Sequence, residues 1–173
     1  MIKKIKFFII VIFFFCYNSF LFAENKILFI DINFIFSNSD AGKKVNDKVQ
    51  ADAKKITTEL NKYQKEIQKD KDKLISQKNV LSQEELQKKS ISLEKKAKDF
   101  NKIISDKNNK LSEYKKNSNI KFYQLLTKVV GEYSAENSVE MIVKKENILI
   151  GKTSLDATQD ILNLFNKSVK EIK

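Results

Sequence analysis

Lysines dominate the residues whose spacing could support chemistry. Lys88, Lys95 and Lys102 recur every seven residues, and Lys89 and Lys96 lie beside two of them. On a helix, a seven-residue repeat forms a basic stripe that drifts slowly around the axis. Such a stripe is either a solvated outer face, which is its commoner use, or a surface that attracts acidic chains, phospholipid headgroups or lipopolysaccharide phosphates. The spacing alone leaves both interpretations open.

The composition excludes most catalytic chemistry. The 173-residue sequence has no His, Trp or Pro, and its single cysteine is Cys16. Once the segment that carries Cys16 is removed, Cys–His or Ser–His–Asp catalysis, Cys/His zinc sites and disulfides are impossible. The acidic residues alternate with lysines at helical spacing, which is typical of a solvated face. We therefore expect no catalytic residue, no cofactor and no metal site, although chemistry by carboxylates alone stays formally open.

Two further binding motifs are weak. Residues 151–154, with the sequence GKTS, resemble the end of a phosphate-binding loop, but Glu146 stands where that motif needs its first glycine. Gly151 is expected to end a strand instead. Nucleic acid is also an unfavoured partner, because all 33 cationic residues are lysines and none is the arginine that reads bases by paired hydrogen bonds.

Residues 1–23 have the organisation of a cleaved signal peptide. Three lysines precede an unbroken apolar run at 7–15, and the small residue Ala23 precedes a polar segment. A retained membrane anchor is the alternative, but the run is shorter than the roughly 20 residues that a bilayer needs. Cys16 also lacks the small preceding residues of a lipidated cysteine. Cleavage leaves 30 lysines against 22 acidic residues, an excess that favours anionic partners.

Residues 43–130 carry the pattern of a long helical hairpin. No proline interrupts them, and apolar residues recur every three or four positions in both halves, which predicts one apolar stripe on each helix. Ser82 is followed by Glu85 in the spacing of a capping box, which marks a helix start. The sequence therefore predicts a turn near 76–82 between two antiparallel helices of about 50 Å each, which together form one arm. A single continuous helix is the alternative.

Residues 24–42 and 131–173 are predicted to form a small body. Gly42 is expected to break the chain before the hairpin. The predicted elements are strands near 26–32, 139–144 and 147–151, the last two as a β-hairpin, a helical turn at 33–36 and a final helix at 156–171. About 60 residues bury too little apolar surface to be stable alone without a disulfide or metal. Oligomerisation through the body is the expected remedy.

The order of these parts resembles the Skp/OmpH family. The resemblance rests on "ILFIDINFIFSNSDAGKK" at the start, "LSQEELQKK" at the turn and "VEMIVKKENILIGKTSLDATQDILNLFNK" at the end. It spans the whole chain after residue 23, and the two ends carry most of its specificity.

The resemblance implies a fold and a function. The fold would be mainly α with a small β body, in a homotrimer whose three helical hairpins hang around a cavity. The function would be that of an ATP-independent holdase in the periplasm of a Gram-negative bacterium, which shelters unfolded outer-membrane proteins. Anionic lipid or lipopolysaccharide is a further candidate partner, and nucleic acid is not expected.

Candidate contacts for such clients lie near the tip and along the lysine stripe. They are Leu74, Ile75, Val80, Leu81, Lys88, Lys95 and Lys102. The alternative function is that of an exported coiled-coil spacer or adaptor, which would link envelope components without binding unfolded chains.

Overall fold

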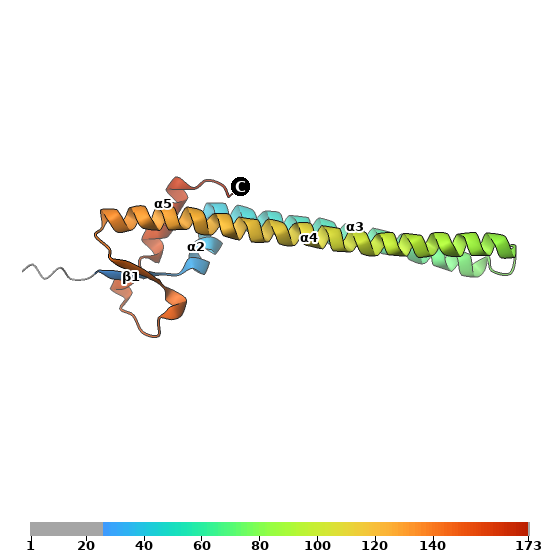
Figure 1. The fold of residues 1–173 in the computed structure, drawn as a ribbon, viewed down its shortest axis with the longest axis horizontal. Coiled ribbons are helices and arrows are strands. Elements are labelled where there is room, and N and C mark those ends of the chain that lie inside the picture. Colours follow the sequence, from blue (N-terminus) through green and yellow to red (C-terminus); the bar gives the residue numbers. More distant parts are fainter. Residues whose placement is uncertain (1–25, 173) are drawn as a thin grey trace, which may run out of the picture.

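A long helical hairpin projects from a small body at one end of the molecule (Figure 1). The computed structural model describes residues 26–172, so the predicted signal peptide lies outside the described residues. The elements in order are β1 (Ile27–Ile30), α2 (Ile32–Asn38), α3 (Asp40–Ser76), α4 (Gln83–Glu136), β2 (Met141–Lys144), the 3-10 turns η1 (Lys145–Asn147) and η2 (Thr153–Leu155), and α5 (Thr158–Ser168). Within 26–172, no helix has the combination of length and apolarity that crossing a bilayer requires.

The two strands of the body come from opposite ends of the chain. β1 and β2 pair in parallel, with Ile27 opposite Met141 and Ile30 opposite Lys144. The backbone N–H of Ala157 donates to the carbonyl of Phe29 at 2.9 Å, which holds the start of α5 against the same strand. The helical turn predicted at 33–36 is confirmed as part of α2.

The strand predicted at 147–151 is wrong, and so is the β-hairpin that it would complete. Residues 145–147 form η1, and although Ile148 is half-buried, Leu149 and Ile150 beyond it are 98% and 90% exposed. Alternating apolar residues favour a strand, but a strand needs a neighbour to accept its backbone hydrogen bonds. Residues 26–172 of one chain provide no such neighbour here, so Gly151 does not end a strand either.

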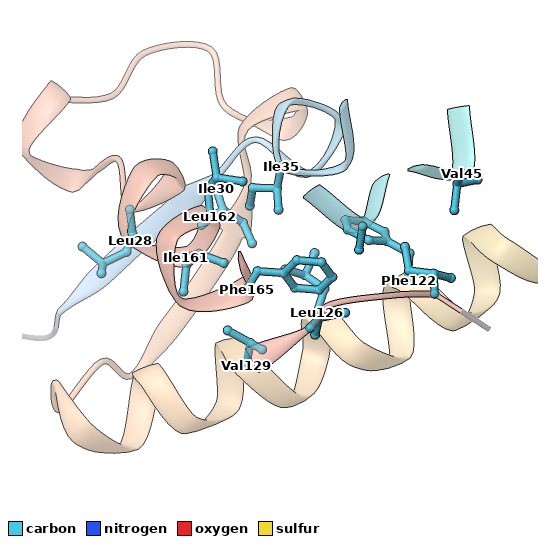
Figure 2. Packing of buried hydrophobic residues seen from close by; sticks show 14 of the residues in the cluster. Leu28, Ile30, Ile35, Val45, Phe122, Leu126, Val129, Ile161, Leu162 and Phe165 are labelled. Atoms are coloured by element: carbon cyan, nitrogen blue, oxygen red, sulfur yellow. The ribbon is translucent and has the colours of Figure 1, made fainter. Parts of the chain in front are cut away.

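The core of the body includes the root of the hairpin. Phe122, Leu126 and Val129 of α4 pack against Phe165 of α5 (Figure 2). The rings of Phe122 and Phe165 meet edge to face, with centroids 5.2 Å apart. The predicted boundary at 130–131 therefore does not separate arm from body, because α4 continues through Gly131 to Glu136. Tertiary packing outweighs the modest helix penalty of one glycine.

Gly42 lies inside α3 rather than at a break. The helix begins two residues earlier, and Ser39 caps it by accepting a hydrogen bond from the backbone N–H of Gly42 at 3.1 Å. A side chain at this position would run into the end of α2, because an added Cβ would lie 1.8 Å from the carbonyl oxygen of Phe36. The glycine is needed for this close approach.

The C-terminal segment lies across the base of the hairpin. α5 ends at Ser168, three residues earlier than predicted, yet Val169 and Ile172 beyond it are buried in the core. The ammonium group of Lys44, in the first turns of α3, donates to the carbonyl of Lys170 at 3.1 Å. The end of the chain thus fastens the root of α3 to the body.

Candidate functional site

The tip of the hairpin forms where the sequence predicts it. Residues 77–81 make the turn, and the capping box at the start of α4 is confirmed. The Ser82 hydroxyl lies 2.7 Å from the Glu85 carboxylate, and the backbone N–H of Ser82 donates to that carboxylate at 3.0 Å. These hydrogen bonds, the hydroxyl first, lower the pKa of Glu85 below its ordinary value. Two helices are therefore present, and the single continuous helix is excluded.

The seam between α3 and α4 is half-buried along the arm. Beyond the body, most of its apolar side chains are neither exposed nor fully covered, as for Leu60, Leu74, Leu93 and Leu111. Exposed ion pairs cross the seam between Asp70 and Lys96 and between Glu59 and Lys107. The Lys96 hydrogen bond lowers the pKa of Asp70. Because exposed ion pairs contribute little to stability, apolar packing along the seam provides most of the stabilisation between α3 and α4.

The predicted lysine stripe lies away from the seam. Lys88, Lys95 and Lys102 are all exposed on α4, and Lys88 forms an ion pair with Glu84 at 2.5 Å. At 100° per residue, the three lysines fall nearly opposite the seam residues Leu93 and Ala97. Lys96 instead reaches across to Asp70 of α3, and Lys89 reaches Gln77 in the turn just after α3. The structure therefore separates the stripe from the apolar positions of the arm.

The predicted apolar contacts near the tip differ in exposure. Leu74 in the seam and Leu81 in the turn are half-buried, whereas Ile75 and Val80 are exposed. Ile75 lies one position off the regular stripe of α3, on one side of the seam. An apolar residue that stands one position off the stripe, as Ile75 does, could have been recognised in the sequence as facing outward.

Two grooves flank the seam close to the tip. The distal apolar groove has a volume of about 480 Å³ and is lined by Ile67, Lys71, Leu74, Ile75, Ser90, Leu93, Glu94 and Ala97. The ionic groove, of about 380 Å³, is lined by Asp70, Lys73, Leu74, Gln77, Lys89, Ser92, Leu93 and Lys96. Leu74 and Leu93 line both grooves, so the two lie on either side of the same half-covered seam. Sequence reasoning missed the grooves, because they depend on how α3 and α4 pair.

The positive charge of the chain is concentrated on the hairpin. Residues 40–136 hold 23 lysines and 15 acidic residues, whereas residues 24–39 and 137–173 together hold seven of each. The arm therefore carries a net charge of +8 and the body is neutral. The electrostatic reach of a surface with net charge is set by the ionic strength of the solution.

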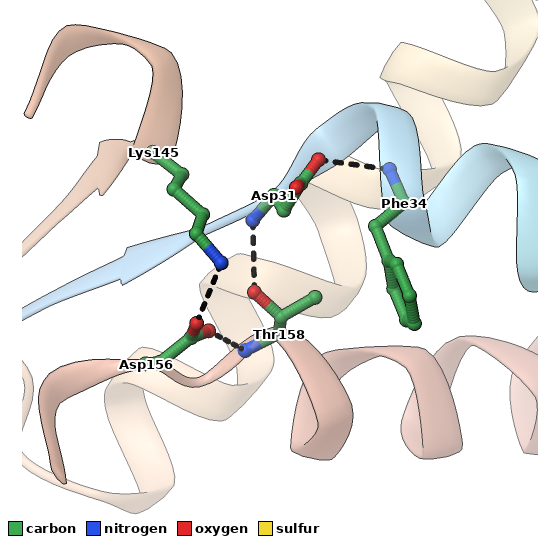
Figure 3. A network of polar contacts seen from close by, with 5 residues as sticks. All are labelled: Asp31, Phe34, Lys145, Asp156 and Thr158. Atoms are coloured by element: carbon green, nitrogen blue, oxygen red, sulfur yellow. Dashed lines mark hydrogen bonds and ion pairs between the residues drawn. The ribbon is translucent and has the colours of Figure 1, made fainter. Parts of the chain in front are cut away.

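The polar cluster of the body caps α2 and ties it to the start of α5. The carboxylate of Asp31 accepts from the N–H of Phe34 at 2.8 Å, and Thr158 accepts from the N–H of Asp31 at 2.9 Å (Figure 3). Asp156 accepts from the N–H of Thr158 at 3.0 Å and from Lys145 at 3.1 Å. Partial burial raises the pKa of Asp156, but the hydrogen bonds of Thr158 and Lys145 outweigh it, so the pKa is lowered. Among residues 26–172, no group of acidic side chains is arranged to hold a metal ion.

Replacing Ser82 by alanine is expected to loosen the tip without unfolding the arm. The change removes both hydroxyl hydrogen bonds of the capping box, so amide exchange at Glu85 and Leu86 should quicken on the order of fivefold. Because the pKa of Glu85 is lowered on folding, the stabilisation exists above the ordinary glutamate pKa and is lost as pH falls through the folded value. The difference between wild type and variant should therefore narrow in acid, where only the hydrogen bond from the Glu85 N–H to the Ser82 hydroxyl still distinguishes them.

Hydrogen exchange followed by mass spectrometry between acidic and neutral pH measures this effect. Ser92→Ala, at an exposed position inside the same helix, is the matched control and should leave the exchange of Glu85 unchanged. Equal exchange in wild type and Ser82→Ala at neutral pH would show that the capping box does not hold the tip.

Comparison with known proteins agrees with this arrangement. The family model for outer membrane protein (OmpH-like) matches residues 26–165. A crystal structure from Caulobacter crescentus, described as a candidate outer membrane chaperone (OmpH-like), superposes with a TM-score of 0.80 at 14% sequence identity. The match covers 86% of this chain and 88% of that one. No curated protein sequence is a significant match. Since the family model covers most of the chain, this protein belongs to the OmpH-like (Skp/OmpH) family.

Proposed function

We propose that this chain is one protomer of a trimeric, ATP-independent holdase that shelters unfolded outer-membrane proteins in the periplasm. The observation that carries the proposal is the hairpin itself, which combines net positive charge with apolar side chains left open near its tip. Membership of the OmpH-like family and the likeness to a candidate outer membrane chaperone support it. The predicted signal peptide supports the location.

The exposed apolar surface of the body supports the trimer. Leu149 and Ile150 are almost fully exposed, and Met141 and Ile27 at the start of the paired strands are also open. Further copies of the body would cover these side chains and extend the two-stranded sheet. A neutral body allows copies to pack without net repulsion, whereas arms of charge +8 repel one another. The same charge distribution thus favours joined bodies and splayed arms.

A holdase of this kind needs no catalytic group and no cofactor. It lowers the concentration of free unfolded chain through many weak contacts, and the half-covered seam and exposed apolar residues of the arm can provide them. The lysines would add long-range attraction. The outward stripe of Lys88, Lys95 and Lys102 is the surface that we assign to anionic lipid or lipopolysaccharide.

The test is suppression of aggregation by the chain without residues 1–23. An outer-membrane protein diluted from urea should scatter less light when the chaperone is present at an equimolar ratio of trimer to client. Capture should slow as salt rises from about 50 mM to about 300 mM, because screening shortens the reach of the lysines. Light-scattering mass should give three chains per particle.

Three outcomes would contradict the proposal. No suppression at several-fold molar excess would exclude the holdase, and recovery of one folded partner at fixed stoichiometry would favour the spacer or adaptor instead. A stable monomer at micromolar concentration would exclude the cavity between three arms.

A further inference from the structure

The distal apolar groove has an apolar floor, and the one carboxylate at its rim is paired with a lysine. Ile67, Leu74 and Ile75 of α3 and Leu93 and Ala97 of α4 form the floor. At the rim, the Glu94 carboxylate is paired with the ammonium group of Lys98 at 2.8 Å. Lys71 lies one turn from both Ile67 and Ile75, so its methylene stem extends the apolar wall while its charge reaches water. The groove is therefore suited to an apolar occupant.

The length of the floor favours an extended chain. Ile67 and Ile75 are two helical turns apart, about 12 Å at 1.5 Å per residue. Along a strand, side chains on one face repeat about every 6.7 Å, so two or three of them fit this length. A helix of two turns has little stability of its own in water, so a helical occupant would need a longer groove to stabilise it.

Charge argues against another arm as the occupant. A second hairpin would bring a further net charge of +8 alongside the first, and the apolar floor offers only two turns to offset the repulsion. An unfolded membrane barrel instead provides segments of about ten residues in which apolar and polar side chains alternate. Such a segment would place its apolar side chains in the groove and its polar side chains towards the charged rim.

We infer that the distal apolar groove seats an extended segment with alternating apolar side chains, of the kind found in the membrane strands of unfolded outer-membrane proteins. This inference rests on the proposed function. It adds the place where the client binds and the side-chain pattern of the client that is recognised. The opposite, ionic groove and the outward lysine stripe take no part in this contact.

Two isoleucines near the tip provide a matched test. Ile75 is 63% exposed and lines the groove, whereas Ile91 is 59% exposed and lines neither groove. Ile75→Ser and Ile91→Ser make the same change on helices of the same arm, so their effects on folding should be alike. The probe is a fluorescent ten-residue peptide of zero net charge with alternating apolar residues. The control peptide has the same composition, but its apolar residues recur at helical spacing.

Fluorescence anisotropy with the chain lacking residues 1–23 should show preferential binding of the alternating peptide. Ile75→Ser should weaken that binding about five- to tenfold, the effect of losing one partly buried isoleucine, and Ile91→Ser should leave it within twofold. Equal binding of both peptides, or equal effects of the two variants, would overturn the inference. Aggregation assays separate the two ideas, because suppression by the unchanged chain together with equal peptide binding by the two variants would reject the groove and keep the holdase.

Discussion

The Gly42→Ala variant is expected to lose the native body. An added Cβ would lie 1.8 Å from the Phe36 carbonyl oxygen and 2.8 Å from the Ser39 hydroxyl. The first of these is backbone, which cannot rotate away as a side chain can. Relief requires α2 and α3 to separate, which breaks the Ser39 cap and opens the core beside Ala41 and Val45. We expect a loss of at least about 3 kcal/mol in the free energy of unfolding.

Gly131 provides the matched control for this substitution. It also lies inside a long helix, but no atom lies within 4 Å of the position of an added Cβ. Gly131→Ala should therefore fold normally and gain up to about 1 kcal/mol, because alanine favours the helix more than glycine does. Urea denaturation followed by tyrosine fluorescence measures both variants. Equal stability of the two would show that α2 does not approach α3 so closely.

The Phe165→Ala variant should release the root of the hairpin from the body. Phe165 is fully buried, and its ring meets Phe122 of α4 edge to face. Removing the ring leaves a cavity between α5 and α4, at an expected cost of about 3–5 kcal/mol. Small domains have only about 5–15 kcal/mol in total, so most of the native population should be lost at moderate denaturant.

Phe34 is the control for Phe165, from which it differs in solvent exposure. Phe34 of α2 is 44% exposed, and Phe34→Ala should therefore cost much less. Urea denaturation should show a large fall in the midpoint for Phe165→Ala and a small one for Phe34→Ala. A small, equal shift in both variants would mean that the contact between α5 and α4 does not hold the body together.

Local signals predicted the hairpin well. The capping box of Ser82 and Glu85 is complete within four residues, so the turn follows from neighbouring side chains alone. The apolar stripes depend on helical period, which is also local, and they do form the seam. The opposition of the lysine stripe and the seam follows from the same period.

Features that depend on distant partners could not be predicted in this way. A glycine such as Gly42 marks either a break or a close approach, and only the position of α2 decides between them. The strand expected at 147–151 needs an edge that these residues do not find in one chain. The grooves depend on register, which sets Asp70 opposite Lys96 and so determines what lines each side of the seam.

Because the C-terminal segment fixes only the root of α3, the rest of the hairpin can pivot about that root as a lever does. Buried contacts on α3 end at Val45, and the next seam position, Val49, is already only half-buried. From there to Ser76 the helix extends about 40 Å. A rotation of about 10° at this fulcrum would carry the tip through about 7 Å, roughly the spacing of alternate residues in a strand. Small strains at the root are thereby converted into displacements on the scale of a bound segment.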